Sequence, residues 1–103
     1  MTTKSQLNAC RDALMAGMRA ATRGAIPDES AGEIIRACLD LVEHSLSRDP
    51  AMVTAVDVGT TLAVLERASV ELGSVATTPP AASASIQNAC QRLRLLMGEL
   101  TQT

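Results

Sequence analysis

Apolar residues recur at helical spacing between Ser30 and Arg48, and charged residues line the opposite side of the same segment. Ser30 and Glu33 have the spacing of a capping box, in which each side chain accepts a hydrogen bond from the other residue's amide. The inward positions are Ala31, Ile34, Ile35, Cys38, Leu41, Val42 and Leu46. The pattern therefore predicts an amphipathic helix over 30–48.

Asp49 and Pro50 end this helix and are predicted to start the next, because proline has no amide to donate and aspartate is a good N-cap. Helices joined so tightly must lie side by side and antiparallel. The third helix is predicted over 50–72, with Gly73 as its C-terminal cap. Its inward stripe is Ala55, Val58, Leu62, Leu65, Ser69 and Leu72.

The β-branched run AMVTAVDVGTTLAVL, residues 51–65, also has the composition of a β-hairpin. A hairpin among three helices would have no sheet to join, and the following segment ERASVELG is typical of a helix. We therefore favour a helix here and keep the hairpin as the alternative.

The two ends of the chain show the same helical periodicity, which predicts helices over about 4–23 and about 82–102. Their inward stripes are Leu7, Cys10, Leu14, Gly17, Met18 and Ala21 in the first, and Ile86, Cys90, Leu93, Met97 and Leu100 in the last. GAIPDE and SVATTPPAAS are predicted linkers, because glycine, proline and small polar residues interrupt helices.

Four helices of about 20 residues with short links predict an all-α protein, a single domain over 1–103 that forms an up-down-up-down four-helix bundle. Five apolar residues fall outside the predicted inward stripes: Met15, Leu39, Val53, Val64 and Leu95. One such residue is ordinary on a surface, whereas five on a small domain favour a second buried surface. We therefore expect a homodimer with these residues at its interface.

The chain contains no Phe, Trp or Tyr, which changes the expected core. Aromatic rings bury the most area per residue, so this core must be built from aliphatic side chains, Met, Cys and many Ala. A thin core of this kind favours closely packed helices. The same absence removes the stacking platforms that bases, sugars and quaternary ammonium ligands use.

Charge argues against a nucleic-acid partner, since the net charge is −2 and no basic excess is available to neutralise phosphates. Basic residues concentrate in 1–27 and acidic residues in 28–57. Neighbouring helices with complementary faces explain this segregation, and a basic docking patch is the alternative. The chain has neither a signal-peptide pattern nor an apolar run of about 20 residues, so we expect a cytoplasmic protein without a membrane partner.

Cys10, Cys38 and Cys90 each fall on a predicted inward stripe. Their odd number and wide spacing favour buried free thiols in a reducing compartment. A structural zinc site needs about four Cys or His ligands, some closely spaced, and this chain has neither a Cys-x-x-Cys nor a His-x-x-x-His pair. A bundle can gather three distant thiols in its core, but we predict no metal and no cofactor.

His44, the only histidine, follows Asp40 by four residues, so the two side chains can meet on one helix face. A carboxylate and the end of a helix both favour the charged imidazole, as acid–base chemistry or a switch would require. A nucleophile is not at hand, because Cys38 precedes His44 by six residues and lies on a different side of the helix. We interpret His44 as an ordinary residue near a helix end.

The string EHSLSRD is similar to the site of histidine phosphotransfer domains at three positions, His44, Ser45 and Leu46. Those domains are helical bundles that present a reactive histidine on an exposed face. Ser47 and Arg48 stand where that family has lysine and glycine, and the helix ends one residue later, where the family's helix continues. The similarity therefore gives an alternative rather than a family.

These patterns favour a non-catalytic helical interaction module, homodimeric, that presents a surface to a protein partner. One alternative is a binder of a small apolar ligand, with a pocket within or between bundles bordered by Met18, Cys90 and Met97, because an interior lined by Met and Ala can leave a cavity. The second alternative is phosphotransfer or an enzyme that uses His44.

Overall fold

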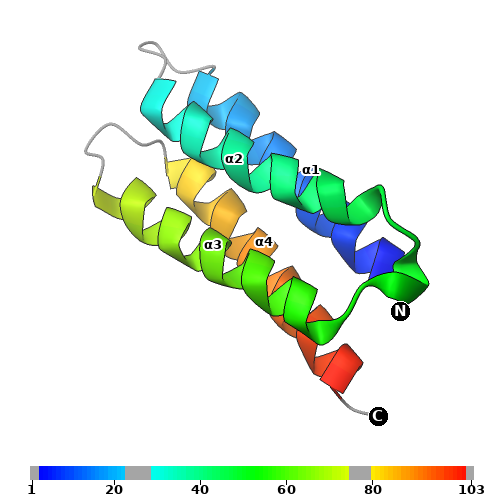
Figure 1. Ribbon diagram of the computed structural model, residues 1–103. Helices are drawn as coiled ribbons and strands as arrows, with labels where there is room; N and C mark the ends of the chain where they lie inside the picture. Colours follow the sequence, from blue (N-terminus) through cyan, green and yellow to red (C-terminus); the bar gives the residue numbers. More distant parts are fainter. Residues whose placement is uncertain (1–2, 23–28, 75–79, 102–103) are drawn as a thin grey trace.

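The computed structural model describes residues 3–22, 29–74 and 80–101. These ranges contain four α-helices and one turn of 3-10 helix (Figure 1): α1 (Thr3–Thr22), α2 (Glu29–Leu46), η1 (Pro50–Met52), α3 (Ala55–Ser74) and α4 (Pro80–Thr101). No described residue is in a strand, so the hairpin alternative is wrong. The prediction of an all-α protein with four helices packed together is confirmed.

Helices α1, α2 and α4 lie within two residues of their predicted bounds at both ends. α2 begins at Glu29, but the Ser30 side chain of the predicted capping box lies outside the described structure. The predicted linker GAIPDE lies outside the described residues except for Glu29, which begins α2. Half of the predicted linker SVATTPPAAS lies outside them, and its other residues belong to the end of α3 and the start of α4. Only the start of α3 departs clearly from the prediction.

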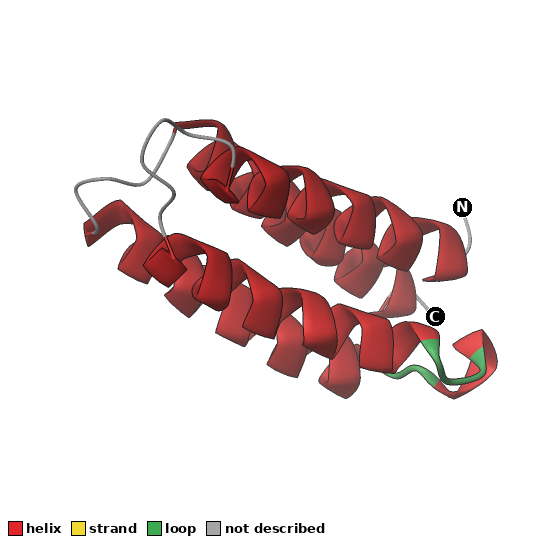
Figure 2. Ribbon diagram, turned by 90° about the horizontal axis from the view of Figure 1, so that it is seen from above, coloured by secondary structure: helices red, strands yellow, loops and turns green. Residues whose placement is uncertain are grey.

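The helices pack as a ring, in which α1 and α3 each contact α2 and α4. The α1–α4 pair is the most closely packed and the α2–α3 pair the least. Figure 2 shows the helices lying side by side along the long axis of the molecule, which measures 46 × 21 × 18 Å. Each helix therefore has one face toward a shared core and one toward solvent.

The core between the helices is built mainly from aliphatic and sulfur-containing side chains, and Gln6 and Thr61 are buried with them. Its largest fully buried apolar side chains are Leu14, Ile35, Leu65, Leu72, Ile86, Leu93, Leu96, Val42, Cys10 and Cys38. Buried alanines come from all four helices, as the composition requires: Ala13, Ala21, Ala31, Ala68, Ala82 and Ala89. Small side chains at these positions let the helix axes approach one another.

The buried face of α2 contains most of the predicted stripe, because Ala31, Ile35, Cys38 and Val42 are buried, but its edge differs from the prediction. Leu39 is only 3 % exposed and Ile35 is fully buried, whereas Leu41 is 38 % exposed. The prediction that Leu39 lies at an outer interface is therefore wrong. The pattern predicted the inward face but not which leucine at its edge, Leu39 or Leu41, is buried.

The link between α2 and α3 also differs from the prediction. Asp49 caps the 3-10 turn η1, where its Oδ1 accepts a hydrogen bond of 3.0 Å from the Ala51 amide. Val53 follows this turn and is 5 % exposed, so its assignment to an outer interface is wrong. The turn η1 packs against α1, and the chain after it buries Val53 in the core before α3 begins.

A capping box starts α3 at Thr54 rather than at Pro50. The Thr54 amide donates to Asp57 Oδ2 at 3.1 Å, and the Asp57 amide donates to Thr54 Oγ1 at 3.3 Å. Arg48 lies 3.5 Å from the same carboxylate. These reciprocal bonds satisfy orphan amides of the first turn.

Helix α1 lies close to α4 at Gly17. A Cβ added at this buried glycine would lie 2.9 Å from the Cβ of Ser85, closer than two carbon atoms pack. Gly98 on α4 is different, because a Cβ there would meet nothing within 4 Å. Glycine is thus required at one position and only tolerated at the other.

We expect Gly17→Ala to lower the free energy of unfolding by about 1–3 kcal/mol through overpacking. Gly98→Ala is the matched control and should raise it by up to about 1 kcal/mol, because alanine is the better helix former. Urea unfolding followed by circular dichroism measures both. Equal effects of the two substitutions would contradict the close contact between α1 and α4.

The capping box should make stability depend on pH. Hydrogen bonds from the amide and hydroxyl of Thr54 lower the pKa of the Asp57 carboxyl in the folded state, and Arg48 adds to the effect. The resulting stability is present above the unfolded carboxyl's pKa of about 3.9 and is lost as pH falls through the lower folded pKa. We expect Asp57→Asn to lower the urea midpoint at pH 7, with a gap from wild type that narrows below about pH 4. A gap independent of pH would contradict this account.

Candidate interaction surface

Large apolar side chains that remain exposed gather on α3. In the described part of the chain the exposed ones are Leu41, Met52, Val56, Val64, Val70 and Leu95. Three of these six are valines of α3, and Val56 and Val70 are 77 % and 75 % exposed. Helix α3 therefore presents apolar residues to solvent as well as to the core.

The exposed positions of α3 follow a heptad spacing. One outward stripe runs along the whole helix at steps of four, three, four, three and four residues: Val56, Thr60, Ala63, Arg67, Val70 and Ser74, called the α3 stripe below. All six residues are exposed. Arg67 is its only charged member, and residues 58–65 carry no charge at all. Its apolar members, Val56, Ala63 and Val70, recur every seven residues, which is the spacing of one of the two contact positions in paired helices.

The opposite side of α3 supplies the core with Val58, Leu62, Leu65 and Leu72, all buried. The helix therefore carries an apolar inward face and an outward stripe in which Val56, Ala63 and Val70 alternate with polar residues. A helix with apolar residues on both sides is expected where it is covered on both sides.

Two shallow hollows flank the α3 stripe. The hollow toward α4 has a volume of about 580 Å³ and a mostly apolar lining that includes Val56, Ala63 and Met97. The hollow toward α2 measures about 300 Å³ and includes Ile34 and Ala37 in its lining. Val64 and Arg67 line both hollows. The surface is thus ridged along α3 and recessed on either side.

The remaining predicted interface residues, Met15 and Leu95, lie away from α3. Met15 on α1 is half-buried and borders a hollow between α1 and α2 together with Arg11, Arg19 and Glu43. Leu95 on α4 is exposed. Only Val64 among the five predicted residues borders the hollows beside the α3 stripe.

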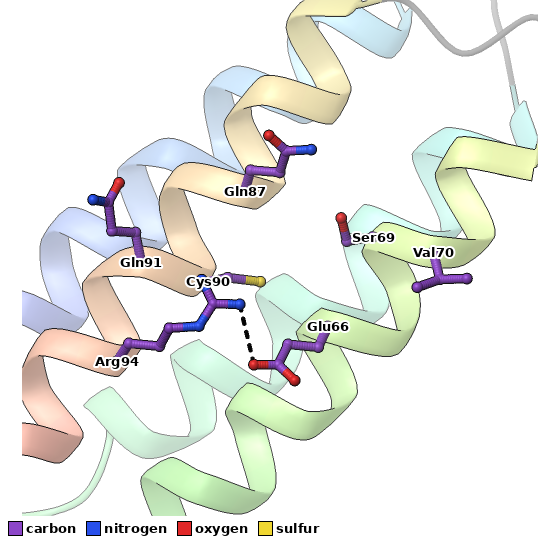
Figure 3. A pocket seen from close by; sticks show the side chains of 7 residues that line it. All are labelled: Glu66, Ser69, Val70, Gln87, Cys90, Gln91 and Arg94. Carbon is purple, nitrogen blue, oxygen red and sulfur yellow. Dashed lines mark hydrogen bonds and ion pairs between the residues drawn. The ribbon is translucent and has the colours of Figure 1, made fainter.

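A polar groove of about 720 Å³ lies between α3 and α4 beside the C-terminal half of the α3 stripe, and Val70 is among its lining residues (Figure 3). Arg94 and Glu66 close it with an ion pair of 3.2 Å. Gln87 and Gln91 of α4 line it, and the Cys90 thiol lies between the two helices. The groove is amphiphilic and open, unlike the enclosed apolar pocket that the ligand-binding alternative requires.

The residues of that alternative lie apart. Cys90 borders the polar groove, whereas Met97 borders the apolar hollow beside α3. Met18 packs against the core from α1. Cys90 and Met97 thus face two different hollows, both open to solvent.

The three cysteines are buried, protonated thiols. Burial raises the pKa of Cys10 to about 12 and that of Cys38 to about 11, and neighbouring cysteines add to both shifts. Burial also raises the pKa of Cys90. The Cys10 thiol donates to the Ala89 carbonyl at 3.6 Å. Among the described residues no group of three or more Cys, His, Asp or Glu side chains is arranged to hold a metal ion.

His44 is exposed in the last turn of α2. Asp40, its expected partner, instead accepts a hydrogen bond of 3.3 Å from Arg36 Nε. The His44 carbonyl accepts from the Ser47 hydroxyl at 2.6 Å, but the imidazole makes no hydrogen bond or ion pair with the described residues. The expected contact between Asp40 and His44 is therefore not formed.

The ion pairs of the described chain do not join α1 to α2. They link Arg11 to Asp12, Arg36 to Asp40, Arg48 to Asp57 and Arg94 to Glu66. Arg19 of α1 and Glu43 of α2 line the same hollow but form no ion pair with each other, although basic and acidic residues are segregated along the sequence. Ion pairs between the described residues therefore do not hold α1 and α2 together.

We expect all three native thiols to resist Ellman's reagent at pH 8 and to react at once in denaturing urea, because the thiolate is the nucleophile and burial suppresses it. The reaction rate should follow the unfolded fraction across a urea titration. Ala81→Cys, at an exposed position of α4, is the control and should react without urea. A native thiol that reacts as fast as this control would contradict the buried cluster.

None of the helices in the described ranges combines the length and the apolar content needed to cross a bilayer. Comparison of the chain with models of protein families, with curated protein sequences and with solved structures gives no match.

Proposed function

We propose that this protein is a non-catalytic helical interaction module that works as a homodimer and presents a surface to a protein partner. Its helices form an up-down-up-down bundle, and the α3 stripe is its contact surface. The observation that carries the proposal is the exposed heptad of α3, with Val56 and Val70 about three-quarters exposed at either end.

Hydrophobic burial favours covering this surface. Fully burying a valine side chain contributes about 1.5–3 kcal/mol of free energy, so covering the exposed valines of α3 would stabilise each monomer by several kcal/mol. Single exposed apolar residues are common on soluble proteins. A set at heptad spacing along one helix, between two hollows, is a feature of helix-pairing surfaces.

Other features of the chain support the proposal less directly. Three free, buried cysteines suit a reducing compartment, and we place the protein in the cytoplasm on that basis. The His44 and apolar-ligand alternatives have weaker support, because the His44 imidazole has no partner among the described residues and Cys90 and Met97 border different hollows.

Sedimentation equilibrium tests the proposal. We expect wild type to be dimeric at micromolar concentration and Val70→Glu to raise the dimer dissociation constant at least tenfold, about 1.4 kcal/mol, because a carboxylate would be buried in an apolar contact. Ala16→Glu adds the same charge at an exposed site of α1 and should leave the constant unchanged. The proposal would be overturned if wild type were monomeric at about 100 μM. Equal effects of the two substitutions on the dissociation constant would also overturn it.

A further inference from the structure

We infer that the bundle opens locally between α2 and α3, at the end of their contact that lies away from the link from Asp49 to Thr54, and that this opening uncovers the Cys38 thiol. The α1–α4 pair stays packed while the bundle opens. The opening is a property of the single subunit, so it goes beyond the proposed function and does not depend on the homodimer. Proteins open locally where few buried contacts hold their parts together.

The ring has four seams, each formed by two neighbouring helices, and they are unequally packed. The α1–α4 seam is the closest, and it contains the Gly17 contact and the hydrogen bond from the Cys10 thiol to the Ala89 carbonyl. The α3–α4 seam carries the ion pair between Arg94 and Glu66. The α2–α3 seam is the most loosely packed of the four, so its separation loses the least contact energy.

The hollow of about 300 Å³ lies within the α2–α3 seam and thins its packing further. Its charged lining residues are Glu33, Arg67 and Glu71, and their side chains make no hydrogen bond or ion pair with the described residues. Val64 also lines the hollow and remains 38 % exposed. Polar bonds therefore do not close this part of the seam, and its apolar edge at Val64 is partly open to solvent.

The opposite end of the same seam is held by the link between the two helices (Figure 1). Arg48 lies 3.5 Å from the Asp57 carboxylate, Val53 is buried in the core, and η1 packs against α1. The hollow instead involves Glu33 in the first half of α2 and Glu71 in the second half of α3. The link is therefore the hinge, and the seam opens from the other end.

Each cysteine lies at a different seam. Cys38 lines the α2–α3 hollow and Cys90 lines the α3–α4 groove, whereas Cys10 contacts α4 through the Ala89 carbonyl. All three are at most 3 % exposed in the closed bundle. A separation of α2 from α3 therefore uncovers Cys38 first. Cys10 is uncovered last, because it lies in the most closely packed seam.

Labelling of the wild-type protein with N-ethylmaleimide at pH 8 tests the inference. The three cysteines fall in separate tryptic peptides, 5–11, 37–48 and 68–92, so mass spectrometry gives three rates from one sample. In buffer without urea we expect Cys38 to label about tenfold faster than Cys10, with Cys90 between them. All three should label more slowly than the exposed control Ala81→Cys.

The dependence on urea separates local opening from unfolding. Cys10 requires global unfolding, so its labelling rate should rise steeply with urea. The rate of Cys38 should rise only weakly at first, because a local opening exposes less surface. Within the unfolding transition all three rates converge on the unfolded fraction. Equal rates and equal slopes below the transition would overturn the inference, and so would Cys10 or Cys90 as the fastest thiol.

Gly17→Ala supplies a second test, because it weakens the α1–α4 seam, which the local opening leaves intact. It should accelerate the labelling of Cys10 about fivefold or more and leave the Cys38 rate in urea-free buffer unchanged. Gly98→Ala, where an added Cβ meets nothing within 4 Å, is the matched control and should accelerate neither thiol. If Gly17→Ala accelerated Cys38 as much as Cys10, one unfolding event would expose both thiols and the inference would be wrong.

Discussion

Close approach between helix axes is the constraint on which the rest of this structure depends. The chain has no aromatic ring with which to fill space between distant helices, so dispersion must come from many short contacts. Alanines are buried on all four helices, and α1 meets α4 at Gly17. Such a core contains few large side chains whose truncation would leave a large cavity, but it has little room for added atoms.

The same constraint explains why α3 differs from its neighbours. The α2–α3 seam is the most loosely packed in the ring, and hollows lie on both sides of the α3 stripe. Helix α3 therefore contributes β-branched residues both to the core and to the outer surface. If a second copy covers that helix, the bundle gains a further contact beside its most loosely packed seam, and folding and association become linked through mass action.

Periodicity predicted the existence of all four helices and the ends of three, because hydrophobic spacing reports a helix directly. It predicted the inward face of α2 but not the edge of that face, since Leu39 and Leu41 are both apolar and only tertiary contacts choose between them. Val53 was misplaced for a related reason: a Pro at a helix start and a Pro in a 3-10 turn look alike in sequence. The sequence singled out Val64, which borders the hollows beside the α3 stripe, but the exposure of Val56 and Val70 in the stripe itself was not predicted.

The short link from Asp49 to Thr54 sets more than the path of the chain. Successive residues of an α-helix are rotated by about 100°, so adding or deleting one residue before Thr54 would turn α3 about its own axis. Because α3 carries apolar residues on two sides, a rotated helix could still bury valines and alanines, with Leu62 and Leu65 brought toward solvent. The hydrogen bonds between Thr54 and Asp57 thereby fix the rotational phase of the helix, and with it the identity of the side that other molecules meet.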